Sequence, residues 1–547
     1  MCASRFATHE VLNQPPPLEN VNLFEQDRAL AEAALREGAD RERLAAFGAW
    51  LGSPEAIRLG EQANRHAPEL RSHDRFGHRI DEVAFHPAWH ALMQRAIAER
   101  VPNLPWAEPG PGAHVTRAAA AFLLNQVESG VCCPMAMTFA AVPALHDAPA
   151  LAAAWLPKIL SDTYDATSAP VAAKRGATIG MAMTEKQGGS DVRANNTTAR
   201  PAGDGAFELV GHKWFCSAPM SDGFLTLAQT EAGLSCFFVP RWLPDGRNPI
   251  HIQRLKDKLG NRSNASAEIE YAGALGWLVG EDGHGVRSII KMVHHTRLDA
   301  AISAAGIMRQ AVAQALHHAA HRSAFQKKLI DQPLMRNVLA DLALESEAAT
   351  VLVMRLAGAF DRSAYDPRAL AIARLATPIA KYWICKRTPS AVVEALECLG
   401  GNGYVEESIL ARLYREAPVN SVWEGSGNVI CLDVLRAMAR EPDALGALLD
   451  EVRQTRGSDT RLDRARERLE RALADRSEPE HRARHLVEQL ALVLSASLLV
   501  RHAPAEIADA FCAARLGDQA GRQFGTLPRG LDVVAICERA RPRRDQA

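Results

Sequence analysis

The sequence that decides the fold occupies residues 181–191 and reads MAMTEKQGGSD. Two adjacent glycines, Gly188 and Gly189, lie between Thr184 and Ser190. Because glycine has no side chain, such a segment lets backbone N–H groups approach an anion or a flat ring closely. A simple turn between two strands has the same composition, so the segment alone leaves both interpretations open.

A second segment, residues 211–217, follows about one strand pair later and reads GHKWFCS. Two neighbouring strands would bring the hydroxyl groups and aromatic rings of both segments to one surface, which suits a flavin ring. For Trp214 or Phe215 taken alone, packing in a hydrophobic core is the more common role. The two segments together make a flavin-binding surface a hypothesis that the rest of the chain has to support.

The sequence pattern changes twice around these segments. Before about residue 180, apolar residues recur every three and four positions, which predicts amphipathic helices. From Ile179 to about Leu278, short apolar runs are separated by Gly, Asp and Pro turns, which predicts an antiparallel β-domain. Helical patterns return from Gly285 to about Arg440. This order predicts an α+β fold that is mostly α, rather than alternating βαβ units.

We expect four domains, because 547 residues exceed what one hydrophobic core organises. They are an N-terminal helical domain (1–180), a β-domain (181–280), a central helical bundle (281–444) and a C-terminal helical domain (445–547). Residues 446–547 contain 18 arginines, 16 acidic residues and no lysine. The chain ends in RARPRRDQA, which is typical of a frayed basic tail.

Composition limits the cellular setting and the partners. A net charge of −1 provides no global field that steers the molecule to nucleic acid, so any DNA affinity has to come from a local patch. Ten cysteines without a C-x-x-C pair favour a reducing cytoplasm over a zinc site or a disulfide framework. The N-terminus lacks a signal-peptide core, and the longest apolar run, Leu490 to Val500, indicates a buried helix. We therefore expect a cytoplasmic protein with no membrane association.

Several other motifs carry little weight. His317, His318 and His321 have helical spacing, but no carboxylate or cysteine joins them, so we expect no metal site. Gly400–Gly403 lack the strand-then-helix context of a dinucleotide fingerprint. No P-loop and no G-x-S-x-G motif is present, which argues against a nucleotide triphosphatase and a serine hydrolase.

The two segments resemble the acyl-CoA dehydrogenase family, whose β-domain carries M-x-x-T-E-x-x-x-G-S-D and then G-x-K-x-(aromatic)-I-(T/S). The resemblance continues through residues 258–264 (KLGNRSN), 322–325 (RSAF), 397–404 (ECLGGNGY) and 422–428 (VWEGSGN). It spans roughly residues 115–440 and keeps the family's order of motifs. The resemblance implies FAD as cofactor and acyl-CoA as a candidate substrate.

On this match Thr184 and Ser190 hydrogen-bond the flavin, and Ser217 lies near flavin N5. The arginine of the 322–325 motif reaches the flavin pyrophosphate of a neighbouring subunit in the family, which implies an oligomer. The resemblance assigns FAD contacts to Met181, Met183, Thr184, Gly188, Gly189, Ser190, Phe215, Cys216, Ser217, Arg322, Phe325, Gly400, Gly401, Val422, Trp423, Gly425, Ser426, Gly427 and Asn428.

The resemblance also assigns the catalytic base to Glu424. Dehydrogenation of a thioester removes an α-proton as hydride leaves the β-carbon, and a carboxylate in a water-excluded site suits that task. The thioester carbonyl is polarised by hydrogen bonds. A glutamate in a glycine-rich loop is more often a solvated charge, but its place among four other family motifs favours the catalytic role.

Further segments resemble the AidB branch of this family, namely 9–15 (HEVLNQP), 85–90 (FHPAWH), 184–190 and 423–428. The additional C-terminal helical region fits the same branch. AidB proteins are FAD-containing tetramers of the bacterial response to DNA alkylation, which bind double-stranded DNA and dehydrogenate acyl-CoA weakly. The resemblance therefore implies double-stranded DNA as a partner of the C-terminal region.

The arginines of one predicted helix provide modest physical support for DNA binding. Arg461, Arg464, Arg468 and Arg471 recur at spacings of three, four and three, which places them within about 80° of arc. Such a stripe suits a row of phosphates. Glu467 lies close by, and charged helix surfaces are common without any partner.

Three functions remain open at this point. The first is a flavoprotein that binds DNA and guards it against alkylation. The second is an ordinary dehydrogenase for short or branched acyl-CoA without a DNA role. The third is a scaffold in which FAD is only structural.

Overall fold

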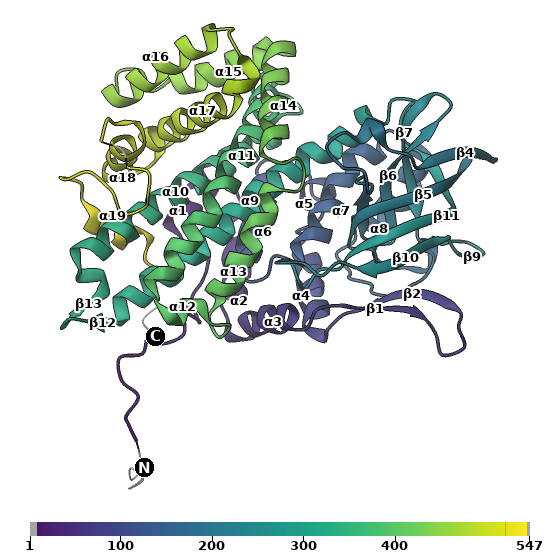
Figure 1. Ribbon diagram of the computed structural model, residues 1–547, viewed down its shortest axis with the longest axis horizontal. Coiled ribbons are helices and arrows are strands. Elements are labelled where there is room, and N and C mark those ends of the chain that lie inside the picture. The colour runs from purple at the N-terminus through teal and green to yellow at the C-terminus, as the bar shows by residue number, and fades with distance from the viewer. Residues whose placement is uncertain (1–7, 520, 544–547) are drawn as a thin grey trace.

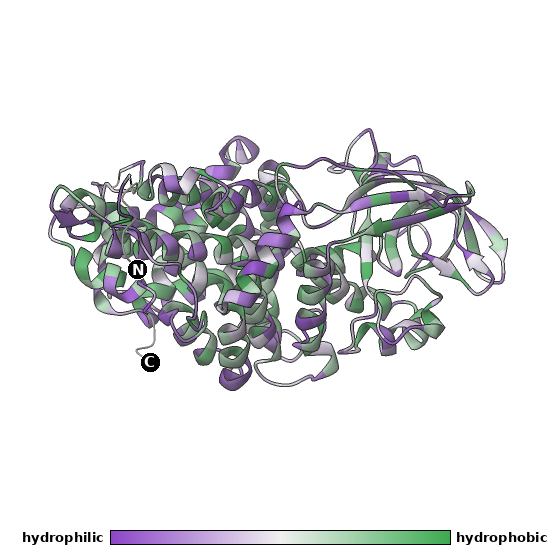
Figure 2. Cartoon of the chain, turned by 90° about the horizontal axis from the view of Figure 1, so that it is seen from below, coloured by the Kyte–Doolittle hydropathy of each residue, from purple (hydrophilic) through white to green (hydrophobic). Residues whose placement is uncertain are grey.

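The computed structural model describes residues 8–519 and 521–543. A β-domain lies at one end of the molecule, and long helices fill the other (Figure 1). Figure 2 shows the same division from another side, with hydrophilic residues on the outward turns of the helices. The fold is α+β and mostly α, as the sequence predicted.

The N-terminal region is helical but also contains a β-hairpin that the sequence pattern did not predict. The turn of the hairpin is stabilised by Asp74, whose Oδ1 accepts hydrogen bonds from the backbone N–H groups of Phe76 and His78 at 2.8 and 2.9 Å. The elements in order are α1 (Arg28–Arg36), α2 (Arg41–Leu51), α3 (Pro54–Arg65), β1 (Glu69–His73), β2 (Arg79–Ala84), α4 (Pro87–Ala98), α5 (Leu104–Ala107), α6 (Ala113–Asn125), α7 (Cys132–Leu145) and α8 (Pro149–Ile159).

The β-domain is a seven-stranded sheet in the order β10-β11-β7-β6-β3-β5-β4, and β11 also pairs with β5. The prediction of an antiparallel domain was partly wrong, because β3 and β4 each run parallel to β6. The alternation of apolar and polar residues indicates which face of a strand is buried, but it does not indicate whether the adjacent strand runs parallel or antiparallel. The sheet strands are β3 (Ile179–Ala182), β4 (Thr198–Gly203), β5 (Ala206–Ser217), β6 (Gly223–Thr230), β7 (Gly233–Pro240), β10 (Ile250–Leu255) and β11 (Ser266–Leu278), and a small hairpin consists of β8 (Trp242–Leu243) and β9 (Gly246–Arg247).

Three long helices form the core of the helical body. They are α9 (Gly285–His321), α10 (Pro333–Arg362) and α11 (Pro367–Cys398), and they pack against one another along alanine-rich faces. Shorter elements follow two of the long helices: β12 (Ser323–Ala324) and β13 (Lys327–Lys328) after α9, and α12 (Gly401–Tyr404), α13 (Ile409–Glu416) and α14 (Gly427–Arg440) after α11.

The C-terminal helices pack on this core. They are α15 (Pro442–Arg453), α16 (Thr460–Ala474), α17 (Pro479–His502), α18 (Ala505–Phe511) and α19 (Val533–Ala540). Helix α17 contacts α10, α11 and α14. By length and composition α17 could cross a membrane, but 72% of its most apolar window is buried inside the protein. The run from Leu490 to Val500 lies in α17, which confirms the predicted buried helix.

The prediction of a frayed basic tail was wrong for the first residue of that tail, Arg539. The side chain of Arg539 is buried and donates hydrogen bonds to Glu347 and Glu32, on α10 and α1. Ion pairing therefore anchors α19, a feature that a run of arginines does not reveal in a sequence. Residues 544–547 lie outside the described residues.

Candidate functional site

The two segments at 181–191 and 211–217 meet in the sheet. Met181 on β3 pairs with Ser217 on β5, and the Trp214 N–H donates to the Thr184 carbonyl at 2.8 Å. Side chains two positions apart in a strand share a face, so Phe215 and Ser217 lie on the same side of β5. Phe215 is 50% exposed. This face presents an aromatic ring and a hydroxyl side by side.

The opposite face of the same strands is closed. Cys216 is completely buried among the apolar residues of the sheet core. Its side chain therefore cannot contact a ligand on the Phe215 face, and only its backbone is available there.

The glycine pair allows the loop after β3 to fold tightly. A Cβ atom at Gly189 would lie 2.3 Å from the Thr184 Oγ1, so only glycine permits this approach. Gly188 has a φ of +147°, and the space around its missing side chain is open. Gly188, Gly189 and Ser190 are all exposed, which leaves their backbone groups accessible to a ligand.

A buried ion pair, which was not predicted from the sequence, underlies this loop. The Lys213 Nζ lies 2.8 Å from Glu185 Oε1, and both side chains have no exposed surface. Glu185 also accepts from the Thr197 hydroxyl at 2.6 Å and from the Asn196 N–H at 2.7 Å. Burial opposes ionisation of Glu185, but these hydrogen bonds and Lys213 lower its pKa to about 2. The pair ties the loop to β5, and nothing in the sequence distinguishes Glu185 from the other charged residues of its segment, Lys186 and Asp191.

Glu424 lies between α13 and α14, in the loop 422–426. Its Oε2 accepts a hydrogen bond from the Thr296 hydroxyl of α9 at 2.7 Å. Burial raises the pKa of the Glu424 carboxyl, and the hydrogen bond from Thr296 together with the charges of Lys381 and Arg297 opposes the rise. A carboxyl with a raised pKa takes up and releases a proton closer to neutral pH than an exposed one.

The backbone of this loop is held from two helices. Glu424 has a φ of +59°, which is unfavourable for a residue with a side chain. Lys381 Nζ of α11 donates to the carbonyls of Trp423 and Gly425, on either side of Glu424. Arg297 Nε donates to the Glu424 carbonyl at 3.1 Å. These contacts fix the strained backbone and thereby the direction of the carboxylate.

Replacing Thr296 with Val is expected to raise the pKa of Glu424 further, because the carboxylate loses a donor that favours its charged form. If Glu424 is the base, the acid limb of the pH profile of flavin reduction then moves to higher pH by about one unit. Stopped-flow measurement of flavin absorbance across pH tests this. Thr388→Val is the control, because Thr388 donates only to carbonyls of Ala304 and Ile384. An unshifted limb in Thr296→Val contradicts the expectation.

The remaining residues of the 422–428 motif lie at the start of α14. Val422 is 65% exposed, Ser426 precedes the helix, and Gly427 is buried. The Trp423 indole donates to Asn420 at 3.1 Å, which fixes the ring. The Asn428 Oδ1 already accepts from Arg484 at 2.8 Å. A contact between Asn428 and a flavin would therefore use its amide N–H group.

A second group of predicted FAD-binding residues lies away from Ser217 and Glu424. Arg322 and Phe325 belong to the β12–β13 hairpin, and Gly400 and Gly401 lie at α12; Figure 1 shows both elements at the end opposite the β-domain. Phe325 is 93% exposed. Within the described residues the two groups lie apart, and the expectation that Arg322 reaches the flavin of a neighbouring subunit stays a prediction.

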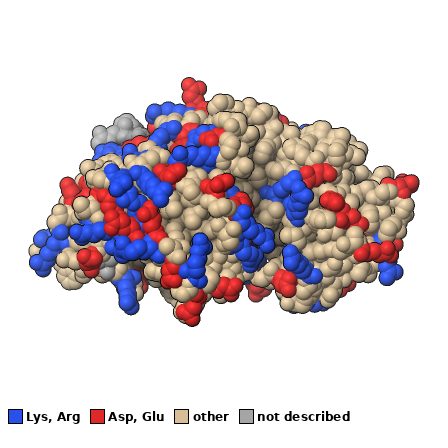
Figure 3. Space-filling model, turned by 90° about the horizontal axis from the view of Figure 1, so that it is seen from above, with Lys and Arg blue, Asp and Glu red and all other residues tan. Residues whose placement is uncertain are grey.

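The four predicted DNA-binding arginines all lie on or at the start of α16, but they differ in environment. Arg464, Arg468 and Arg471 are exposed, and within the described chain none of the three forms an ion pair. Arg461 instead pairs with Asp459 and Asp509. Basic and acidic side chains are interspersed on the face that looks upward in Figure 1 (Figure 3). Three arginines, rather than four, thus lack an acidic partner, although Arg468 Nη2 donates to the Leu516 carbonyl at 3.4 Å.

Comparison with known proteins identifies the family. The family described as adaptive response protein AidB N-terminal domain matches residues 13–166, and the middle and C-terminal domains of acyl-CoA dehydrogenase match 180–274 and 283–439. A protein of Escherichia coli (strain K12) named as an acyl-CoA dehydrogenase, AidB, is 50% identical over 94% of this chain and 95% of its own length. The chain belongs to the AidB branch of the acyl-CoA dehydrogenase family.

Relatives outside bacteria and solved structures agree with this assignment. Acyl-CoA dehydrogenase family member 11 of Caenorhabditis elegans is 31% identical, covering 86% of this chain and 81% of its own. The crystal structure of Caenorhabditis elegans ACDH-11 in complex with C11-CoA has a TM-score of 0.85 at 27% identity and covers 96% of this chain and 97% of that one. An acyl-CoA dehydrogenase complexed with FAD from Bacillus anthracis shares the fold, with a TM-score of 0.63 at 18% identity, over 78% and 80% of the two chains.

The AidB-type chain is thus an acyl-CoA dehydrogenase-type oxidoreductase with FAD as its cofactor, which confirms both predictions. The residues present fit this cofactor. The exposed ring of Phe215 on β5 offers a flat surface. The open space at Gly188 leaves room for a ligand beside the loop that follows β3. The hydroxyls of Thr184, Ser190 and Ser217 supply donors of the kind that a flavin accepts.

Three side chains around Glu424 were not predicted from the sequence. Thr296 and Arg297 lie in the helical run 285–321, and Lys381 lies within α11. All three are buried or nearly so. Buried polar residues in an apolar helix are a general signal of a polar site, but nothing in the sequence says which loop they face.

Proposed function

We propose that this chain is an FAD-dependent acyl-CoA dehydrogenase of weak turnover that also binds double-stranded DNA and protects it from alkylation. The observation that carries the enzymatic part is the half-buried Glu424 carboxylate, which has a raised pKa and is held by Thr296 in a fixed loop. The DNA part rests on the similarity to AidB and on the exposed arginines of α16.

In the proposed reaction Glu424 removes the α-proton of an acyl-CoA thioester. FAD, when bound, supplies the acceptor for the hydride that leaves the β-carbon. Thr296 keeps one carboxylate oxygen oriented, and Lys381 and Arg297 hold the loop so that the other oxygen is directed at the substrate. Fixing the base in this way reduces the reorganisation needed in the transition state.

Acyl-CoA as the substrate class is supported by the similarity to ACDH-11, whose structure contains C11-CoA. Anaerobic titration of the FAD-loaded protein with short and branched acyl-CoAs tests this part. Stoichiometric loss of flavin absorbance is expected. A bound flavin that keeps its absorbance with every acyl-CoA would leave the DNA role without a dehydrogenase activity.

We further propose a homotetramer. The exposed Phe325 at the tip of the β12–β13 hairpin is a large apolar side chain that a neighbouring subunit would cover. Light scattering of the FAD-loaded protein measures the mass of the assembly directly. A monomer at micromolar concentration would contradict the proposal.

Replacing Arg464, Arg468 and Arg471 together with Gln is expected to weaken binding to a short DNA duplex. If each arginine contacts one phosphate, the slope of log affinity against log salt falls by about 2.7 in magnitude. Fluorescence anisotropy at several salt concentrations provides the measurement. These side chains are exposed, so the fold is retained, whereas deleting the C-terminal helices would expose the core that α17 covers.

A matched control removes the same charge elsewhere. Arg71, Arg75 and Arg200 are exposed on the β1–β2 hairpin and on β4, and their triple Gln variant should keep the wild-type salt slope. Equal losses in both triple variants would show non-specific charge attraction. An unchanged slope in the α16 variant would place the DNA site elsewhere or favour the alternative function, an ordinary short- or branched-chain acyl-CoA dehydrogenase.

A further inference from the structure

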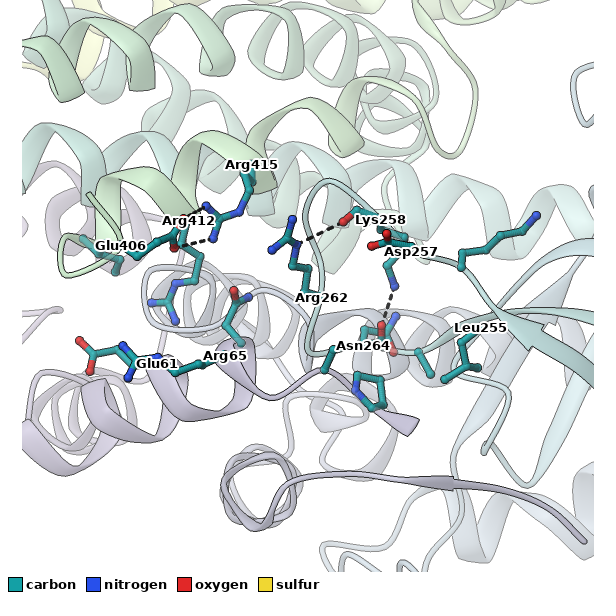
Figure 4. A pocket seen from close by; sticks show the side chains of 16 residues that line it. Glu61, Arg65, Leu255, Asp257, Lys258, Arg262, Asn264, Glu406, Arg412 and Arg415 are labelled. Atoms are coloured by element: carbon teal, nitrogen blue, oxygen red, sulfur yellow. Dashed lines mark hydrogen bonds and ion pairs between the residues drawn. The ribbon is translucent and has the colours of Figure 1, made fainter. Parts of the chain in front are cut away.

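A cavity of about 640 Å³ lies between α3, the loop from β10 to β11, and α13. Figure 4 shows side chains from all three elements around it. Its described lining contains none of the residues predicted to contact FAD or to act as the base. The cavity adjoins the Phe215 face, because Lys256 of its lining lies 4.8 Å from the centre of the Phe215 ring, but its lining does not include Glu424 and the proposed function does not use it.

The lining is strongly basic. Six cationic side chains line the cavity, against three acidic ones, Glu61, Asp257 and Glu406. The cationic residues are Arg65, Lys256, Lys258, Arg262, Arg412 and Arg415. An excess of positive charge inside a concave site attracts and retains anions.

The arginines converge although they come from different elements. The hydrogen bond from Arg415 lowers the pKa of Glu406 most, and attraction from Arg262 and Arg65 adds to the effect. Arg415 is satisfied by its ion pair with Glu406. In the described chain neither Arg65 nor Arg262 forms an ion pair, and both are exposed toward solvent. These two guanidinium groups are therefore available to a ligand.

Two buried polar groups in the lining also lack partners. Asn264 is 1% exposed, and neither its Nδ2 nor its Oδ1 has a hydrogen-bond partner among the described atoms. Arg412 is 8% exposed; its Nη2 donates to the Val127 carbonyl at 2.8 Å, but its Nη1 has no partner. Buried groups of this kind are normally satisfied in folded proteins. Both line the cavity, so a bound ligand with several acceptor atoms would satisfy them.

We propose that this cavity binds a small phosphate-bearing ligand. Guanidinium groups form paired hydrogen bonds with phosphate oxygens, and the residues from three elements can surround one phosphate group or two. The volume lies within the range of small-molecule sites and is too small for a macromolecule. Leu255, Ile409 and Pro68 add an apolar wall that suits the sugar or base of a nucleotide.

The cavity is connected to the flavin-facing strand. The Lys258 Nζ donates to the Ser266 hydroxyl at 3.1 Å, and the Ser266 hydroxyl lies 3.3 Å from that of Ser217. Ser266 also pairs with Ser217 in the sheet. Occupancy of the cavity should therefore shift the absorbance spectrum of bound FAD by a small amount.

Isothermal titration of the FAD-loaded protein with inorganic pyrophosphate, and separately with ADP, tests the proposal. Saturable binding is expected, with FAD retained after ultrafiltration. Tighter binding of ADP than of pyrophosphate identifies a nucleotide, and equal binding identifies the free phosphate compound. The variant R65Q/R262Q should weaken binding about tenfold or more. Arg58 on α3 and Arg71 on β1 are exposed and do not line the cavity, so R58Q/R71Q should bind as the wild type does.

Four results would overturn the proposal. The first is an absence of saturable binding of either probe to the wild-type holoprotein. The second is equal binding by R65Q/R262Q and the wild type. The third is release of FAD during the titration, because the cavity would then belong to the cofactor site. A DNA duplex that loses its affinity in R65Q/R262Q, with no binding of the small probes, would likewise reject a small ligand.

Discussion

Replacing Glu424 with Gln is expected to slow flavin reduction by acyl-CoA about 10²- to 10⁴-fold, the range that a positioned base contributes. Glutamine keeps the size of the side chain and its acceptor for the Thr296 hydroxyl, but it cannot remove a proton. The loss corresponds to about 3–5 kcal/mol of transition-state stabilisation. Anaerobic stopped-flow measurement of flavin absorbance gives the rate.

Binding has to be measured separately from the rate. The Glu424→Gln variant should retain FAD and bind a non-reducible acyl-CoA analogue, because the changed group acts on the proton and not on the bulk of the ligand. Glu407→Gln, an exposed change in the loop before α13, is the matched control and should reduce at the wild-type rate. Undiminished flavin reduction in Glu424→Gln would remove Glu424 from the mechanism.

The sequence predicted the location of the base better than the means by which it is held. Glu424 belongs to a short motif, and a motif of this kind is recognised from residues that are adjacent in the sequence. Thr296 and Lys381 lie 128 and 43 residues away, on α9 and α11. Their contact with the loop depends on how three long helices pack, which amphipathic spacing does not specify.

The β-domain shows the same limit. Segments 181–191 and 211–217 predicted two strands on one surface, and the pairing of Met181 with Ser217 places them there. The parallel pairing of β3 with β6 was not predicted, because it depends on the path of the chain through β4 and β5. The β1–β2 hairpin was also missed, since its exposed, polar strands lack the apolar alternation that marks a half-buried strand.

Replacing Lys213 with Met is expected to reduce the stability of the β-domain by about 3–5 kcal/mol, because Glu185 then remains buried without its cation. Denaturant unfolding followed by the fluorescence of the domain measures the loss. The affinity for FAD should fall too, because the ion pair anchors the loop that carries Thr184 and Ser190. Lys327→Met, an exposed change on β13, serves as the control and should unfold as the wild type does.

The dependence of stability on pH distinguishes this ion pair from ordinary packing. The pKa of Glu185 is about 2 in the folded protein, below its ordinary value of 4.5, so its contribution is fully present above pH 4.5 and is lost as the pH falls toward 2. In Lys213→Met the folded-state pKa of Glu185 rises, so the same acid-side loss is smaller or reversed. The variant Lys213→Met/Glu185→Leu should recover much of the lost stability, because it removes the unpaired charge. If the double variant is no more stable than Lys213→Met, the cost lies in packing around residue 213 and not in the buried carboxylate.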